Sequence, residues 1–259
     1  MDLFNFDPAT IFSFFLTLMR ISLILFLMPF FGGSVLPNPI KAALCVVLSL
    51  AVWPLLSFPG TVMPASPWML ALMLLGEIIM GLLLDVIVRF LFAAVQTAGH
   101  YVGFAMGFAI MNVVDPLTGT QEPITGHLLY QTTMLIFLSL NGHLFLLQGL
   151  ADSFQLVPPG GLLINPDLGG HLLAFSGQIF VLAAKIAAPV IASLFLVDLA
   201  LALISRAAPQ MNVLFIGFPL KIGVGFLFLI LVLTALSRYV GEYIIDMGAI
   251  FKTVLRGIS

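Results

Sequence analysis

The segment SRAAPQMNVLFIGFPLKI, residues 205–222, separates two of the most apolar runs in the sequence, ASLFLVDLALALI and GVGFLFLILVLTAL. Proline kinks or breaks a helix, and polar side chains are scarce elsewhere in this chain. The segment therefore predicts a boundary between two long apolar elements, and an ordinary polar turn would satisfy the same pattern. Its polar and helix-breaking residues are Arg206, Pro209, Gln210, Asn212, Pro219 and Lys221.

The composition places the chain in or beside a lipid bilayer. Hydrophobic residues make up 61% of the 259 residues and charged residues only 8%, with a mean hydropathy of +1.21. A soluble protein of this length could not cover its cores with so few charges. The net charge of −2 gives no indication of a nucleic-acid partner. Cys45 is the single cysteine, which excludes an internal disulfide.

About six apolar blocks follow one another along the chain, and none shows the alternation of a barrel strand. A helix needs about 20 apolar residues to cross a bilayer, and most of the blocks approach or exceed that length. Basic residues fall on both sides of a six-span arrangement, so a simple serpentine is doubtful. We therefore predict an all-α, membrane-associated protein whose apolar helices form long hairpins. The blocks are 11–31, 42–58, 68–95, 128–150, 172–204 and 213–236.

Residues 237–259 predict a separate amphipathic helix after the last block. Apolar residues recur at intervals of three and four, and the charged residues fall on the other side. Such a helix could lie on the membrane surface or pack on partner subunits, and the sequence favours neither. The apolar positions are Val240, Tyr243, Ile244, Met247, Ile250, Phe251, Val254 and Leu255.

Seven charged residues lie inside the apolar blocks, where each costs about 2.5–3.5 kcal/mol unless it is paired or hydrated. Asp85 and Arg89 are four residues apart and can pair on one helix. Lys185 and Asp198 would lie about 20 Å apart on one helix and cannot pair with each other. The charges indicate either a proton or ion pathway or structural pairing within a helical assembly. We expect these charges to be buried: Arg20, Glu77, Asp85, Arg89, Lys185, Asp198 and Lys221.

The region 99–121 combines glycine spacing with an apolar run and a turn. Gly99, Gly103 and Gly107 recur every fourth residue, which on a helix lets a neighbouring backbone approach closely. A run rich in Met and Phe then ends at a turn-forming Asp-Pro pair. A deformable plug and a re-entrant packing loop are both consistent with this composition. The candidate plug residues are Gly103, Phe104, Met106, Gly107, Phe108, Ile110, Met111, Asp115 and Pro116.

The sequence shows no pattern typical of catalysis, cofactor binding or metal binding. The four histidines are scattered, and neither a glycine-rich phosphate loop nor a nucleophile elbow is present. We therefore expect a protein that is not an enzyme and needs no cofactor or metal. The competing function is a proton-coupled secondary transporter with six helices and Glu77, Asp85 or Asp198 as proton carriers. That function predicts inverted repeats, which are not visible.

Three motifs, RISLILFLMPFFG, MGFAIMNVVDP and SRAAPQMNVLFIGFPLKI, together resemble the FliR family of type III secretion export-gate proteins. The resemblance extends over nearly the whole chain in the same order. It implies a flagellar, inner-membrane protein of the basal body that assembles, as one copy, with FliP and FliQ. FlhB and FlhA would join this complex, and unfolded flagellar proteins would leave through it.

The resemblance also implies how the chain is divided. Residues 1–167 would form a FliP-like helical part that includes a plug at 103–121, and residues 168–259 a FliQ-like hairpin with the C-terminal helix. Residues 205–222 would form the hairpin tip at the cytoplasmic entrance, with Arg206, Pro209, Gln210 and Asn212 supplying its polar groups. The helices of the assembly would form a cone standing largely clear of the bilayer, which explains the unclear topology.

Overall fold

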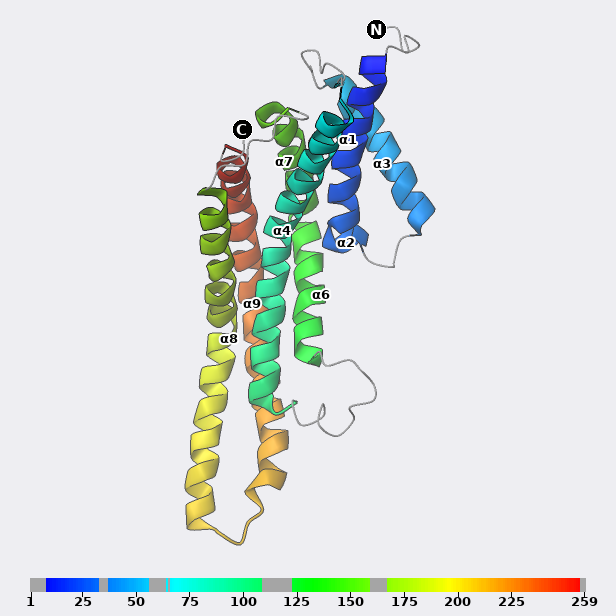
Figure 1. The fold of residues 1–259 in the computed structure, drawn as a ribbon. Coiled ribbons are helices and arrows are strands. Elements are labelled where there is room, and N and C mark those ends of the chain that lie inside the picture. Colours follow the sequence, from blue (N-terminus) through cyan, green and yellow to red (C-terminus); the bar gives the residue numbers. More distant parts are fainter. Residues whose placement is uncertain are drawn as a thin grey trace. The chain divides into compact units, whose positions relative to one another are not determined.

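The computed structural model describes residues 8–32, 37–55, 64, 66–108, 123–158 and 167–256. Every regular element in these ranges is a helix, which confirms the all-α prediction (Figure 1). The elements are α1 (Pro8–Leu27), α2 (Pro29–Gly32), α3 (Asn38–Val52), η1 (Trp53–Leu55), α4 (Pro67–Met106), α6 (Ile124–Ser139), α7 (Gly142–Leu156), α8 (Asp167–Ala207) and α9 (Val213–Arg256).

Prolines define several helix starts. Pro8, Pro29 and Pro67 are the first residues of α1, α2 and α4. A proline is tolerated there because the first amides of a helix have no partner within it, and its fixed φ suits the first turn. Two further prolines, Pro189 and Pro219, lie inside α8 and α9.

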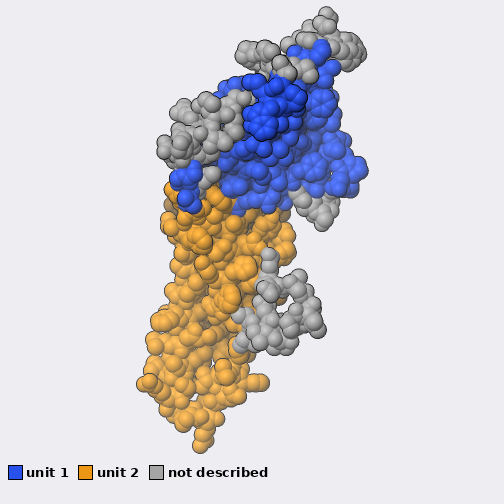
Figure 2. All heavy atoms as spheres, viewed as in Figure 1, with its two compact units in different colours: residues 1–89, 141–173, 244–259 blue, residues 90–140, 174–243 orange. Residues whose placement is uncertain are grey.

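The chain forms two compact units, shown in different colours in Figure 2. Unit 1 comprises residues 1–89, 141–173 and 244–259, and unit 2 comprises residues 90–140 and 174–243. Helices α4, α8 and α9 contribute residues to both units. The two units therefore do not coincide with a division of the chain into two halves.

The core of unit 1 is built from α1, the first part of α4, α7 and the last part of α9. Ile21, Met80, Leu150 and Leu255 are each at most 3% exposed. Close packing is possible because small residues lie where bulky ones approach: a Cβ on Gly149 would lie 2.6 Å from the ring of Phe251. The last turns of α9 thus pack directly on α7.

The core of unit 2 is built from the second part of α4, α6, and the hairpin formed by α8 and α9. A Cβ added to Gly99 would lie 2.4 Å from the Cα atom of Gly126, so the backbones of α4 and α6 approach very closely. Thr125 stabilises this approach by donating a 2.7 Å hydrogen bond to the Gly99 carbonyl. The glycine spacing therefore performs the packing role that the sequence predicted at Gly99.

Four helices are long and apolar enough to cross a membrane: α1, α4, α8 and α9. The bent pair of α6 and α7 would make a fifth if the two helices form one span. Two of the sequence blocks do not form a single helix of spanning length. Helix α3 has only 15 residues, and the block 128–150 is broken at Asn141, which adopts a left-handed φ of 58°.

The C-terminal amphipathic helix is not a separate element. Helix α9 runs without interruption from Val213 to Arg256, so the expectation of a helix beginning near residue 237 was wrong. Its predicted apolar face is correct, because Val240, Ile244, Met247 and Phe251 are at most 3% exposed. From residue 244 onward this face is covered by unit 1 of the same chain, and neither the membrane surface nor a partner subunit is needed to bury it.

Candidate functional site

The centre of unit 1 holds a fully buried ion pair between Arg20 of α1 and Glu77 of α4. The Arg20 Nε donates to Glu77 Oε2 at 2.5 Å, and its Nη2 donates to Oε1 at 2.8 Å. Their side chains are 0% and 1% exposed. Two parallel bonds between a guanidinium and a carboxylate give a stronger and more directional contact than a single bond. The pair therefore fixes the relative position of α1 and α4.

Helix α7 completes the environment of Arg20. The Nη1 atom donates a 3.0 Å bond to the carbonyl of Val157 and a longer, 3.4 Å bond to Ser153 Oγ. The guanidinium carbon lies 4.3 Å from the centre of the Phe154 ring, in cation–π contact. Val157 follows the last residue of α7, where carbonyls lack partners within the helix. One buried cation thus joins three helices of unit 1.

A second ion pair joins Asp85 and Arg89 on α4, as the four-residue spacing predicted. The Arg89 Nε donates to Asp85 Oδ2 at 2.5 Å, and its Nη2 donates to the carbonyl of Leu27. Because Leu27 is the last residue of α1, Arg89 also satisfies a carbonyl at the end of that helix. Arg89 is 51% exposed, whereas Asp85 is 3% exposed.

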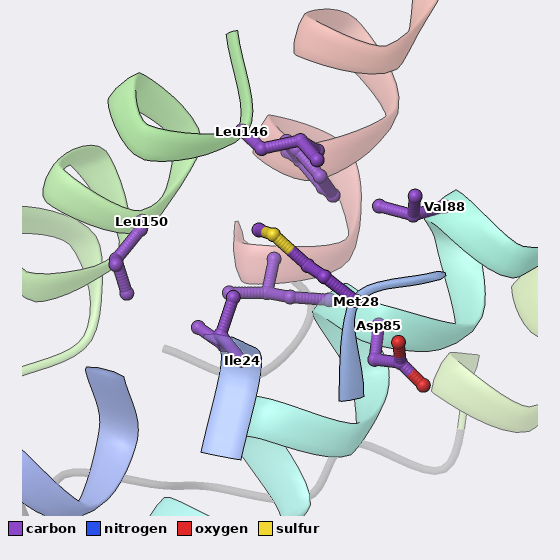
Figure 3. A pocket seen from close by; sticks show the side chains of 8 residues that line it. Ile24, Met28, Asp85, Val88, Leu146 and Leu150 are labelled. Atoms are coloured by element: carbon purple, nitrogen blue, oxygen red, sulfur yellow. The ribbon is translucent and has the colours of Figure 1, made fainter. Parts of the chain in front are cut away.

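Asp85 lies in the wall of a small apolar pocket, of about 10 Å³, in unit 1. Figure 3 shows it close to Met28, with Ile24, Leu146 and Leu150 on other parts of the wall. The Oδ1 atom of Asp85 is buried and has no hydrogen-bond partner among the residues that the structure describes. The volume is at the lower limit for one water molecule, and a water there would find few polar partners. This is no cavity for a ligand or an ion.

The remaining charges inside the apolar blocks are not all buried, contrary to expectation. Arg89, Lys185 and Asp198 are exposed on this chain. Lys185 and Asp198 are exposed because α8 and α9 form a single hairpin layer, which leaves much of each helix surface uncovered by this chain. Asp198 pairs with Lys221 across this hairpin, and Lys221 is 22% exposed.

The candidate plug begins inside a helix. Gly103, Phe104 and Met106 belong to α4, so the first residues of the candidate plug form the end of a helix and not a loop. Gly107 then ends the helix with a φ of 92°. The Phe108 amide donates to the Gly103 carbonyl and the Gly107 amide to the Phe104 carbonyl, each at 3.0 Å. This pair of bonds is a Schellman motif, which favours glycine at the left-handed position.

The residues around this helix end pack against α9 within unit 2. Met106 is fully buried, and its Cγ atom would lie 2.7 Å from a Cβ on Gly225. The Phe108 ring meets the Phe226 ring edge-on, with centroids 6.5 Å apart. The plug candidates Ile110, Met111, Asp115 and Pro116 lie outside the described residues.

The turn between α8 and α9 lies within residues 205–222. Helix α8 ends at Ala207 and α9 begins at Val213, so Pro209 lies in the connecting turn. The Met211 amide donates to the Ala208 carbonyl at 3.0 Å and closes this turn. The four polar or turn-forming residues proposed for the tip are all exposed: Arg206, Pro209, Gln210 and Asn212.

Sequence reasoning missed two of the contacts. It identified Arg20 and Glu77 as costly charges but did not pair them, and it left Asp198 without its partner Lys221. One signal was available. In each of these two pairs, the positive and the negative residue lie in different apolar blocks, so a contact between two helices could have been proposed. Within the described ranges, no group of three or more His, Cys, Asp or Glu side chains could hold a metal ion.

The chain belongs to the family described as "Bacterial export proteins, family 1", whose model matches residues 11–247. It is 36% identical over 229 residues to the flagellar biosynthetic protein FliR of Bacillus subtilis (strain 168), covering 86% of this chain and 87% of that protein. The corresponding protein of Escherichia coli (strain K12) is 32% identical over 82% of this chain and 80% of its own length.

A relative outside the flagellar proteins is also similar. The Yop proteins translocation protein T of Yersinia pestis is 32% identical over 77% of this chain and 76% of its own length. With its long apolar helices, the chain is thus a membrane component of type III protein export. Its location is the bacterial inner membrane, at the flagellar basal body.

Proposed function

We propose that this chain is a core subunit of the flagellar export gate, with one copy assembled with FliP and FliQ into a conduit for unfolded flagellar proteins. FlhB and FlhA join the assembly. The resting conduit is closed in part by residues 103–121 of this chain. This function rests on family membership and on one structural feature, the outward-facing apolar surface of the α8–α9 hairpin.

That surface suits a chain whose helices pack on other subunits. On the hairpin, Phe195 is 66% exposed, Leu214 is 71% exposed and Phe215 is 82% exposed. Soluble monomers rarely expose large contiguous apolar patches, and lipid or protein must cover such side chains. On the same hairpin, the charges of Asp198 on α8 and Lys221 on α9 form an ion pair within the chain.

The proposed division of the chain follows the family. Residues 1–167 act as the FliP-like part and residues 168–259 as the FliQ-like part, with the exposed turn at Pro209 directed to the cytoplasm. The exposed Arg206, Gln210 and Asn212 give this tip the polarity that a water-filled entrance requires.

The closing role is supported by the way α4 ends. The Schellman motif at Gly107 stops the helix, and Phe108 is held against Phe226. Of the described residues on either side of the candidate plug, Phe108 thus lies on α9, and Pro123 directly precedes the first turn of α6. The Met and Phe side chains of the candidate plug can seal an irregular opening without directional bonds. An apolar constriction also resists ions by dewetting.

Co-purification tests the assembly. The tagged chain is expressed with and without FliP and FliQ, solubilised in mild detergent and sized. We expect a defined complex when all three are present, and poor recovery of the chain alone. A stable single chain that transports a solute after reconstitution would instead support a secondary transporter.

A further inference from the structure

Of the seven charged residues inside the apolar blocks, Lys185 alone has no ion pair among the described residues. Arg20 and Glu77 pair with each other, Arg89 pairs with Asp85, and Lys221 pairs with Asp198. Among the described residues, Lys185 has no ion pair or hydrogen bond, and its side chain is exposed. It is thus an unmatched cation on a surface that must be covered.

Lys185 lies deep within α8. It is 12 residues from Leu173 and 22 residues from Ala207, the ends of the apolar part of the helix. At 1.5 Å per residue these distances are about 18 and 33 Å. A lysine side chain extends only about four methylenes, so its ammonium cannot reach a polar zone at either end by bending along the helix.

The surroundings of Lys185 favour a protein helix as the covering element. On the same face, one and two turns along α8, Ala188 and Ala192 are exposed. Small residues at this spacing let another helix approach closely, whereas lipid chains gain nothing from them. A charge covered only by lipid costs about 2.5–3.5 kcal/mol, and a carboxylate on the neighbouring helix removes that cost.

We infer that Lys185 forms an intermolecular ion pair with a carboxylate on an apolar helix of another subunit in the export complex. The pair would fix the position of that helix along α8, because an apolar surface alone permits sliding. This inference rests on the proposed function, since it requires assembly with other membrane subunits.

The test compares Lys185→Met and Lys185→Glu with the wild-type chain, each co-expressed with FliP and FliQ. Methionine keeps the length and helix propensity of lysine but removes the charge. If Lys185 faces lipid, or the water of a conduit, Lys185→Met leaves assembly unchanged or improves it. If it is paired, the carboxylate is stranded, and we expect the yield of assembled complex to fall at least tenfold. Lys252→Met, at an exposed lysine near the end of α9, is the matched control and should assemble normally.

The second arm identifies the carboxylate. Lys185→Glu should abolish assembly, and one Asp or Glu to Lys substitution within an apolar helix of a partner subunit should restore it. Wild-type yield for Lys185→Met, or failure of every such acidic substitution to rescue Lys185→Glu, would overturn the inference. Failure of the wild-type chain to assemble with FliP and FliQ would instead refute the proposed function. Equal amounts of each variant in membranes would show that the chain itself is intact.

Discussion

Removal of Glu77 should destabilise the chain far more than removal of any exposed charge. The variant Glu77→Leu leaves the Arg20 guanidinium, which is 0% exposed, with two neutral hydrogen-bond partners among the described residues, Ser153 and Val157. Breaking a buried pair in this way typically costs 3–5 kcal/mol. At about 1.4 kcal/mol per factor of ten, the folded fraction relative to the unfolded one falls roughly 100- to 4,000-fold.

The double variant Arg20→Met with Glu77→Leu removes both charges and should recover most of this loss. Replacing a buried ion pair with apolar residues of similar volume is often neutral or stabilising by about 1–4 kcal/mol. Loss of the bond to the Val157 carbonyl opposes that gain by about 1–3 kcal/mol. We therefore expect the double variant to lie much closer to the wild type than to Glu77→Leu.

The assay is proteolysis of the solubilised protein at increasing SDS concentration, with the half-cleavage point as the measure of unfolding. The matched control is Glu242→Leu, because Glu242 pairs with Arg238 at 2.9 Å but the two side chains are 56% and 82% exposed. An exposed pair of this kind contributes about 0–1 kcal/mol. Equal half-cleavage points for Glu77→Leu and Glu242→Leu would refute the buried network. So would a double variant that is less stable than Glu77→Leu.

Three further predictions concern the other parts of the chain. Asn212→Cys in a Cys45→Ala background should be labelled by a thiol reagent from the cytoplasmic side, and labelling only from the periplasm would reverse the orientation. The same labelling is expected when Cys45 is present, because burial raises the pKa of the Cys45 thiol and keeps it unreactive. Asp85→Ala should reduce the yield of complex more than Asp85→Asn does. Its effect should be smaller than that of Glu77→Leu, because Arg89 is half exposed and keeps its bond to the Leu27 carbonyl. Equal, wild-type yields for both Asp85 variants would show that the pair contributes nothing. Phe108→Ser with Ile110→Ser should leave the complex assembled but raise ion leakage through resting membranes, and complexes as tight as wild type would place the seal in a partner subunit.

The helices could largely be read from the sequence because their signals are local. Apolar blocks of helical length and the turn at Pro209 both predict elements that the structure contains. The break at Asn141 was missed although Asn141-Gly142 is a strong turn signal, because the surrounding run is apolar throughout. The continuity of α9 was missed for the opposite reason: the polar residues 237–239 suggested a boundary, but none of them breaks a helix.

The site was less predictable because its contacts join distant parts of the chain. Arg20 and Glu77 are 57 residues apart, and no local pattern distinguishes this pairing from others among seven charges. Asp85 and Arg89 could be paired in advance because their spacing fixes them on one helix face. That α4 ends at Gly107 could not be predicted from the sequence either, because glycines at every fourth residue are equally consistent with a helix that continues.

Site-specific cross-linking to a stalled export substrate tests the central claim most directly. A photo-reactive amino acid is placed at Gln210, in the exposed turn between α8 and α9, and at Trp68, which is 73% exposed at the start of α4 in unit 1. A flagellar export substrate fused to a domain that cannot unfold is then trapped during export. If this chain forms the conduit with the hairpin tip at its entrance, Gln210 should cross-link to the trapped substrate, and Trp68 should not. Cross-linking from neither position, in cells where the chain supports export of the unfused substrate, would contradict the proposed conduit.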